Sequence, residues 1–144
     1  MDKKQKIFDL LNSQDYGVLS TVSTDQKPES AVMMITVLPN NTILMGTKKE
    51  SRKHKNLNGN SNVSVIVWNG WTEAQLEGIA EIVEGSEPGF AELKDNLLKR
   101  HSDADTRIDE KTVFILIKPT WARYSALGQK PPEIFEITDW SLPD

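Results

Sequence analysis

The feature that most constrains the fold is a series of short β-prone segments separated by turns of only a few residues. The turn Pro39-Asn40-Asn41 separates two of them, and strands joined so closely pair as an antiparallel hairpin. Residues 63–68 are almost continuously apolar, so we expect a strand buried on both faces, with Trp68 in the core. The candidate strands are residues 16–23, 30–38, 42–47, 63–68, 74–84, 112–119, 121–126 and 133–137. This pattern predicts a mainly β (α+β) fold, a small antiparallel barrel of six or so strands.

A few short helices are expected to flank the barrel. Residues 3–13 place Ile7, Leu10 and Leu11 on one face of a helix. A second helix is expected near residues 51–57, and a third over residues 87–101. Neither a repeat nor a long linker divides the 144 residues, so the sequence predicts a single domain over residues 1–144.

Composition argues against several classes of protein. The chain contains no cysteine, which excludes disulfides and thiolate chemistry. It also has no apolar stretch near the roughly 20 residues that a membrane span requires. The N-terminus lacks the apolar core and cleavage site of a signal peptide, so we expect a cytoplasmic protein with no membrane partner. The net charge of −4 argues against a general nucleic-acid binder.

The sequence contains no familiar catalytic motif. GxSxG and HExxH are both missing, and the acidic residues within 103–110 lack the glycine and the final acid of a calcium loop, so we expect no metal. His54 and His101 are the two imidazoles, and we expect His54 on the exposed surface of its helix. No catalytic residue can be assigned, so an enzyme of this sequence would depend on a bound cofactor.

Residues 48–55 concentrate positive charge in an otherwise acidic chain. They hold five Lys or Arg residues and one Glu, which sum to +4, whereas the rest of the chain sums to −8. Thr47 ends a predicted strand, and Ser51 stands where it would cap the next helix. Hydroxyls, free backbone N–H groups and the cations Arg52 and Lys53 would then converge, which suits a phosphate. The alternative is a solvated surface turn, the usual structure of a charge run.

The spacing Thr47-x-x-x-Ser51-Arg52-Lys53 resembles the pyridoxamine 5′-phosphate oxidase-like family of FMN-binding split barrels, in particular its small, general-stress-protein-like members. The apolar residues 63–68 and the segment QLEGIAEIV that begins at Gln75 follow in the same order as in that family. The resemblance covers roughly residues 3–125. It implies a six-stranded antiparallel split β-barrel, bound FMN, and a homodimer with each flavin in a groove between the subunits.

The resemblance also implies which residues hold FMN. In the family, a strand-end Thr and an Arg-Lys pair hold the phosphate, which points to Thr47, Arg52 and Lys53, with Ser51 as a supporting cap. Ala31 and Thr36 stand where the vitamin B6 oxidase has a phosphate-binding Arg and a Lys, a loss that Lys48 or Lys49 would partly offset. The other expected flavin contacts are Met33, Met34, Ile35 and Thr36 along the isoalloxazine ring, Gln75 near it, and Trp121, either in the dimer groove or in the core.

These features together predict an FMN-dependent oxidoreductase that acts on a small molecule, with electrons from NAD(P)H. We do not expect a true pyridoxamine phosphate oxidase, because of the two replacements and because the family's substrate-binding C-terminal segment is not found. The alternatives are a non-catalytic flavin-binding or stress-related sensor, a related barrel that binds F420 or haem, and a nucleic-acid module. Haem is disfavoured, because only two histidines are available as axial ligands.

Overall fold

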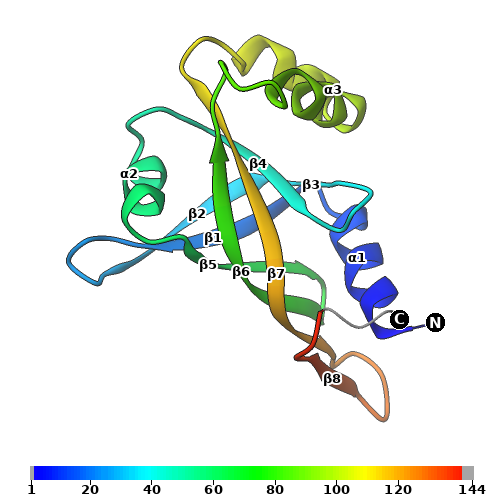
Figure 1. Cartoon of the computed structure of the whole chain (residues 1–144). Coiled ribbons are helices and arrows are strands. Elements are labelled where there is room, and N and C mark those ends of the chain that lie inside the picture. The colour runs from blue at the N-terminus through cyan, green and yellow to red at the C-terminus, as the bar shows by residue number, and fades with distance from the viewer. Residues whose placement is uncertain (1, 141–144) are drawn as a thin grey trace.

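One curled antiparallel sheet organises the described chain, residues 2–140 of a computed structural model (Figure 1). The strands run in the order β2-β1-β5-β6-β7-β4-β3, and β8 pairs with β7. Since β2 and β3 are consecutive in the chain but stand at opposite ends of this order, the sheet curls round and brings β2 against β4 without pairing them. The strands are β1 (Tyr16–Val22), β2 (Pro28–Met34), β3 (Thr36–Val37), β4 (Ile43–Lys48), β5 (Asn62–Asn69), β6 (Thr72–Val83), β7 (Thr112–Ala126) and β8 (Glu133–Ile137).

Short helices flank the sheet, as the sequence predicts. They are α1 (Lys3–Ser13), α2 (Arg52–Gly59), α3 (Phe90–Arg100) and the 3₁₀ helix η1 (Ser102–Arg107). Figure 1 shows α1 and α2 on opposite sides of the curled sheet, and α3 beyond one end of β6 and β7. Ser51 caps α2 as predicted, because its Oγ accepts the N–H of His54 at 3.2 Å. None of the helices within residues 2–140 has the length and apolar character that crossing a bilayer requires.

The sheet has eight strands, as many as the candidate segments in the sequence and more than the six or so expected for the barrel, and the strand bounds differ from those expected at two places. Residues 30–38 do not form one strand, because the backbone of Ile35 bonds outside the ladder. Its N–H donates to the carbonyl of Asp15 at 3.0 Å, and its carbonyl lies 2.7 Å from Nε2 of His101. The predicted hairpin therefore joins only β3 to β4, while β2 pairs with β1. Near the C-terminus, the candidate strands 112–119 and 121–126 form the single strand β7, and residues 133–137 form β8 as predicted.

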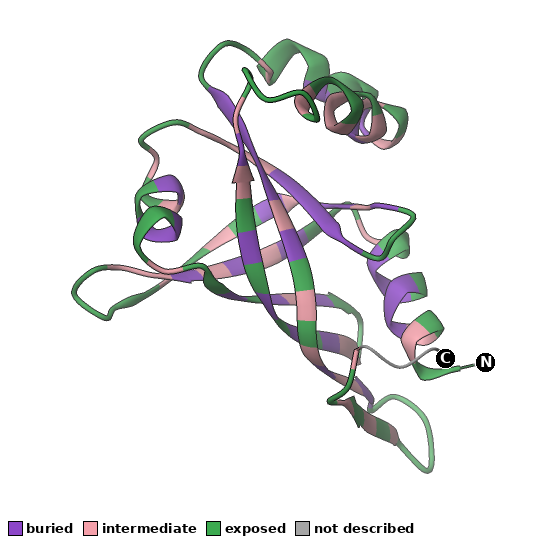
Figure 2. Ribbon diagram, viewed as in Figure 1, coloured by how far each residue is buried: buried purple, intermediate pink, exposed green. Residues whose placement is uncertain are grey.

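Burial alternates along the strands, with one face of the sheet enclosing the core (Figure 2). The expectation that residues 63–68 are buried on both faces is wrong. Val63, Val65 and Val67 are buried, whereas Ser64 is exposed and Trp68 retains half of its accessible surface. Side chains of β5 point alternately to the two faces, and the structure covers only one of those faces.

The uncovered face of the sheet carries apolar side chains. Val18 of β1 stands opposite Val32 of β2 and opposite Ile66 of β5, so the three share one face. Val32 is 69% exposed. Trp121 lies further along the same face, across β5 and β6, and is half-buried. Exposed apolar side chains that are grouped in this way, with polar residues such as Ser64 and Glu77 around them, are a common property of protein–protein interfaces.

Candidate anion and cofactor site

The turn between β4 and α2 brings two hydroxyls and two free amides together. Oγ1 of Thr47 and Oγ of Ser51 are 2.9 Å apart. The N–H of Ser51 donates to the carbonyl of Lys48 at 3.1 Å, which closes the turn. Arg52 and Lys53 begin α2, so their N–H groups have no intrahelical acceptor, and no other acceptor is found for them within residues 2–140. Hydroxyls and N–H groups at a helix start are the donor set that a phosphate requires.

Two of the lysines expected to supply positive charge are held by acids elsewhere in the chain. Nζ of Lys48 lies 3.0 Å from the carboxylate of Asp109 and donates to Oγ1 of Thr112 at 3.0 Å. Lys49 lies 3.8 Å from the carboxylate of Glu84. Lys48 is therefore already engaged, and its expected role as a replacement phosphate ligand requires these contacts to break.

Arg52 also has an acidic partner, Glu29 on β2. The guanidinium donates through Nε at 3.3 Å, and Nη2 makes a second, shorter contact with the same carboxylate. Nδ2 of Asn56 donates to Glu29 as well, at 2.8 Å, and to Oγ1 of the buried Thr21 at 2.9 Å. Arg52 thus joins α2 to β2, and a bound phosphate would have to share it with Glu29. Lys53 has neither a hydrogen bond nor an ion pair to any described residue.

The ion pairs keep these carboxylates charged. Hydrogen bonds from Arg52, and then from Asn56, lower the pKa of Glu29. The hydrogen bond from Lys48 lowers the pKa of Asp109 in the same way. The concentrated charge of residues 48–55 is therefore largely offset by acids distant in the sequence, which the sequence pattern does not reveal.

Of the residues expected along the flavin ring, some are buried in the core and one lines a hollow beside Thr47. Met33 and Ile35 are buried in the main core, so their side chains face away from any ligand outside it. Met34 is half-buried and lines a hollow of about 270 Å³ together with Thr47 and Lys48. Thr36 is buried, and its Oγ1 has no hydrogen-bond partner within residues 2–140. Of this group, Met34 is the side chain placed beside Thr47.

Gln75 and Trp121 lie together, but at a different place. Both line a shallow hollow on the outer face of the sheet, with Val18 and Ile66 on the neighbouring strands. The residues that line this hollow include none of those at the β4–α2 turn. The structure thus brings Thr47, Ser51, Lys53 and Met34 to one region, and Gln75 and Trp121 to another.

The expectation that His54 is a surface residue is wrong. Its side chain is buried in α2, and its Nδ1 accepts the N–H of Glu50 at 3.0 Å. His54 and Leu57 are three positions apart and lie on the same buried helix face, a spacing that could have identified this role. Glu29 and Asn56, which contact Arg52 or its partner, carry no comparable signal, because these contacts span 23 and 27 positions.

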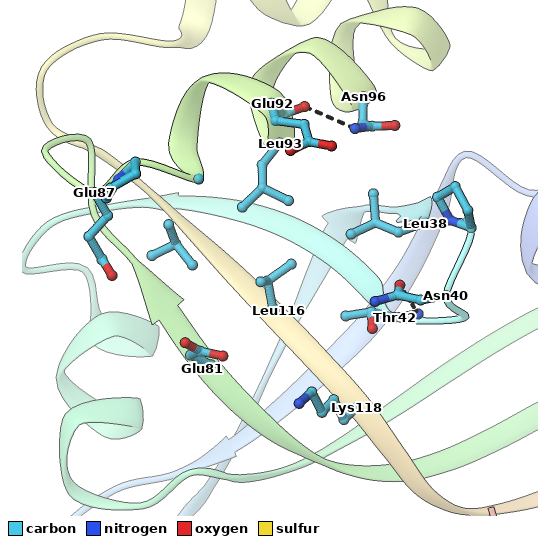
Figure 3. A pocket seen from close by; sticks show the side chains of 14 residues that line it. Leu38, Asn40, Thr42, Glu81, Glu87, Glu92, Leu93, Asn96, Leu116 and Lys118 are labelled. Atoms are coloured by element: carbon cyan, nitrogen blue, oxygen red, sulfur yellow. Dashed lines mark hydrogen bonds between the residues drawn. The ribbon is translucent and has the colours of Figure 1, made fainter.

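A larger hollow, of about 520 Å³, lies away from the turn, between α3 and strands β6 and β7 (Figure 3). Its aliphatic side chains include Leu93 and Leu116. Its charged side chains are three glutamates and one lysine: Glu81, Glu87, Glu92 and Lys118. An excess of carboxylates disfavours a phosphate there, and no residue predicted to hold the cofactor lines this hollow.

A curled antiparallel sheet with short flanking helices defines a class of small split β-barrel proteins. The sequence model of the pyridoxamine 5′-phosphate oxidase family matches residues 4–126, and the chain belongs to this family. The family resemblance drawn from the Thr47-to-Lys53 spacing is thereby confirmed. No curated protein sequence matches the chain.

Solved structures show the same fold. General Stress Protein 26 from Bacillus anthracis is 30% identical, with 93% of this chain and 98% of that chain covered and a TM-score of 0.64. A pyridoxamine 5′-phosphate oxidase-related, FMN binding protein from Nostoc punctiforme is 10% identical, with 92% and 91% covered and a TM-score of 0.68. A protein described as an F420 reductase is 25% identical, with 79% and 93% covered and a TM-score of 0.63. The family fold therefore occurs with more than one redox cofactor.

Proposed function

We propose that this protein binds FMN through its phosphate at the β4–α2 turn and serves as an oxidoreductase for a small molecule. The observation that carries the proposal is the donor set of Thr47, Ser51 and the two free amides at the start of α2, beside the unpaired cation Lys53. Family membership supports FMN as the ligand, because a protein of this fold is described as FMN binding.

The residues of the turn fit a phosphate monoester. Oγ of Ser51 accepts the N–H of His54, so its own proton is free to bond Oγ1 of Thr47. The hydroxyl proton of Thr47 then remains available to a phosphate oxygen, as do the N–H groups of Arg52 and Lys53. The dipole of α2 favours an anion at the same point. Lys53 adds a charge-assisted bond that no acid among the described residues offsets.

Bound FMN would supply reversible two-electron, hydride-type chemistry, which no side chain of this protein can supply. The chain's own residues would bind and orient it. Met34 is the side chain placed to contact a ring that extends from the turn, since it shares a hollow with Thr47. We propose NAD(P)H as the electron donor and a small molecule as the substrate, and we assign no acid or base.

We also propose a homodimer formed through the uncovered face of the sheet. Val18, Val32 and Ile66 form its apolar centre, and Gln75 and Trp121 border it. A Val32→Lys substitution should convert the dimer to a monomer, measured by light scattering during size-exclusion chromatography. The control is Leu127→Lys, because Leu127 is similarly exposed and lies outside this face. If the Val32→Lys variant remained a dimer, the interface would lie elsewhere.

The proposed function is tested by the visible spectrum of the purified protein and by titration with FMN and riboflavin. Riboflavin lacks the phosphate, so it should bind much more weakly than FMN. Lys53→Ala should weaken FMN binding roughly 10- to 100-fold, the value of one charge-assisted hydrogen bond. The control is Lys55→Ala, because Lys55 is also a lysine of α2, follows His54 directly and is exposed. Equal affinity for FMN and riboflavin would contradict the phosphate site.

A deazaflavin is the second candidate cofactor, because the F420 reductase structure is 25% identical over most of both chains. Titration with F420 beside FMN decides between them. Haem is disfavoured on the geometry of the two histidines, since both are buried and each has a ring nitrogen at hydrogen-bond distance from a backbone group. Oxidation of NADH or NADPH by the loaded protein separates an enzyme from a non-catalytic flavin-binding sensor.

A further inference from the structure

We infer that His54 is a positioning residue for the proposed phosphate site, which it preorganises through the backbone of Glu50. The inference rests on the proposed function and assigns a role to a buried ring that the family spacing leaves unexplained. His54 is one position beyond the Arg52-Lys53 pair, and its side chain turns inward, away from the ligand. Its effect on the ligand is therefore indirect and passes through the turn.

The turn contains a residue in an unfavourable conformation. Glu50 has a φ of +67°, in the left-handed region that side chains other than glycine and asparagine rarely occupy. A conformation of this kind persists only where surrounding contacts hold it. The contact at Glu50 is the hydrogen bond from its N–H to Nδ1 of His54, 3.0 Å long and partly buried.

His54 holds the neighbouring residue as well. Its backbone N–H donates to Oγ of Ser51 at 3.2 Å, and that oxygen lies 2.9 Å from Oγ1 of Thr47. One residue thus fixes Glu50 through its ring and Ser51 through its backbone. The orientation of both hydroxyls and of the free amides depends on these two bonds, since all of them belong to one short turn.

The state of the ring follows from its partner. A backbone N–H can only donate, so Nδ1 must be unprotonated and the ring proton resides on Nε2. Nε2 is buried without a partner among the described residues. The ring is therefore kept in place by its packing and by the single bond to Glu50, and not by a network on its far side.

Two substitutions separate this role from simple packing. His54→Asn retains an acceptor near the position of Nδ1, whereas His54→Leu fills the space without one. Adding Glu50→Gly to His54→Leu removes the conformational strain, because glycine adopts a positive φ freely. Restored binding in that double variant is a result that loss of core packing alone cannot give.

The experiment measures dissociation constants for FMN, riboflavin and inorganic phosphate, with hydrogen exchange of the Glu50 amide and a thermal melt for each variant. We expect His54→Leu to weaken FMN and phosphate binding roughly five- to tenfold, by loss of one hydrogen bond, and to leave riboflavin unchanged. The Glu50 amide should exchange faster in His54→Leu. His54→Asn should stay within about threefold of the wild type, and the Glu50→Gly double variant should recover most of the loss.

The inference and the proposed function fail in different ways. Wild-type protein that binds neither FMN nor phosphate would overturn the function, and this inference with it. Wild-type protein that binds both, beside a folded His54→Leu variant of equal affinity, would overturn the inference alone. So would a His54→Asn variant as weak as His54→Leu, or a double variant that regains nothing.

Discussion

Gly78 stands at a close approach of β6 and β7, and substituting it with alanine tests the packing of the sheet. The register shifts there: Glu77 pairs with Trp121 and Gly78 with Pro119, so β7 carries one extra residue. A Cβ on Gly78 would lie 2.7 Å from the carbonyl oxygen of Lys118 and 2.8 Å from Cγ2 of Ile117. Both distances are shorter than Cβ atoms adopt in proteins, and one of the atoms belongs to the backbone.

The strand pair must separate to accept the methyl group. Overpacking of this kind costs about 1–3 kcal/mol, and we expect about 2 kcal/mol because a backbone must move. With an unfolding entropy of about 0.3 kcal/mol/K for 144 residues, that value lowers Tm by about 7 °C. The outer face should change too, since Trp121 is placed by this register.

The assay is thermal and urea denaturation of Gly78→Ala beside Gly85→Ala. A Cβ on Gly85 meets no atom within 4 Å, so the control should stay within about 0.5 kcal/mol of the wild type. Near-ultraviolet circular dichroism reports on the packing of the tryptophans, Trp121 among them. If the two variants lost the same stability, or if Gly78→Ala melted like the wild type, the close approach of β6 and β7 would be refuted.

Three further predictions follow from the ion pairs and the second histidine. Glu29→Gln removes the charge that holds Arg52, so FMN should bind about two- to fivefold tighter by fluorescence titration, and this gain should vanish in an Arg52→Ala background. His101→Leu leaves the carbonyl of Ile35 without its donor, so urea denaturation should show a loss of about 1–3 kcal/mol, and a variant of unchanged stability would contradict the assignment. The pKa values of Glu29 and Asp109 are lowered in the folded state. The stability that these carboxylates contribute is therefore present above their unfolded pKa and is lost as the pH falls through the lowered values. Tm should fall in the acid range, and it should fall less steeply in the Glu29→Gln/Asp109→Asn double variant.

Local signals in the sequence predicted the elements well. The amphipathic spacing of residues 3–13 matches the bounds of α1, and Ser51 caps α2 as expected. These features depend on residues a few positions apart. The break at Ile35 was not predicted, because it depends on Asp15 and on His101, 66 positions later.

The sequence predicts which residues form the candidate site, but not which other residues pair with them. The sequence identifies the hydroxyls of Thr47 and Ser51, and the structure places them in contact. The sequence does not indicate the ion pair between Glu29 and Arg52, because that pair forms only when folding brings β2 next to α2. His54 and Trp68 were misplaced for opposite reasons. The polar ring of His54 suggests exposure to water, but it is buried. The apolar strand that ends at Trp68 suggests burial on both faces, but only one face is buried.

The last turn of α3 has a consequence for how the chain assembles as it is made. Arg100 donates to the carbonyls of Leu11, Asn12 and Gln14 at the end of α1, where Leu11 otherwise accepts only the N–H of Gln14, and His101 contacts the carbonyl of Ile35. Arg100 leaves the ribosome 89 residues after Leu11. The hydrogen bonds from Arg100 to the end of α1 can form only after most of the polypeptide has been synthesised. A nascent chain shorter than about 100 residues should therefore remain a substrate for chaperones and proteases.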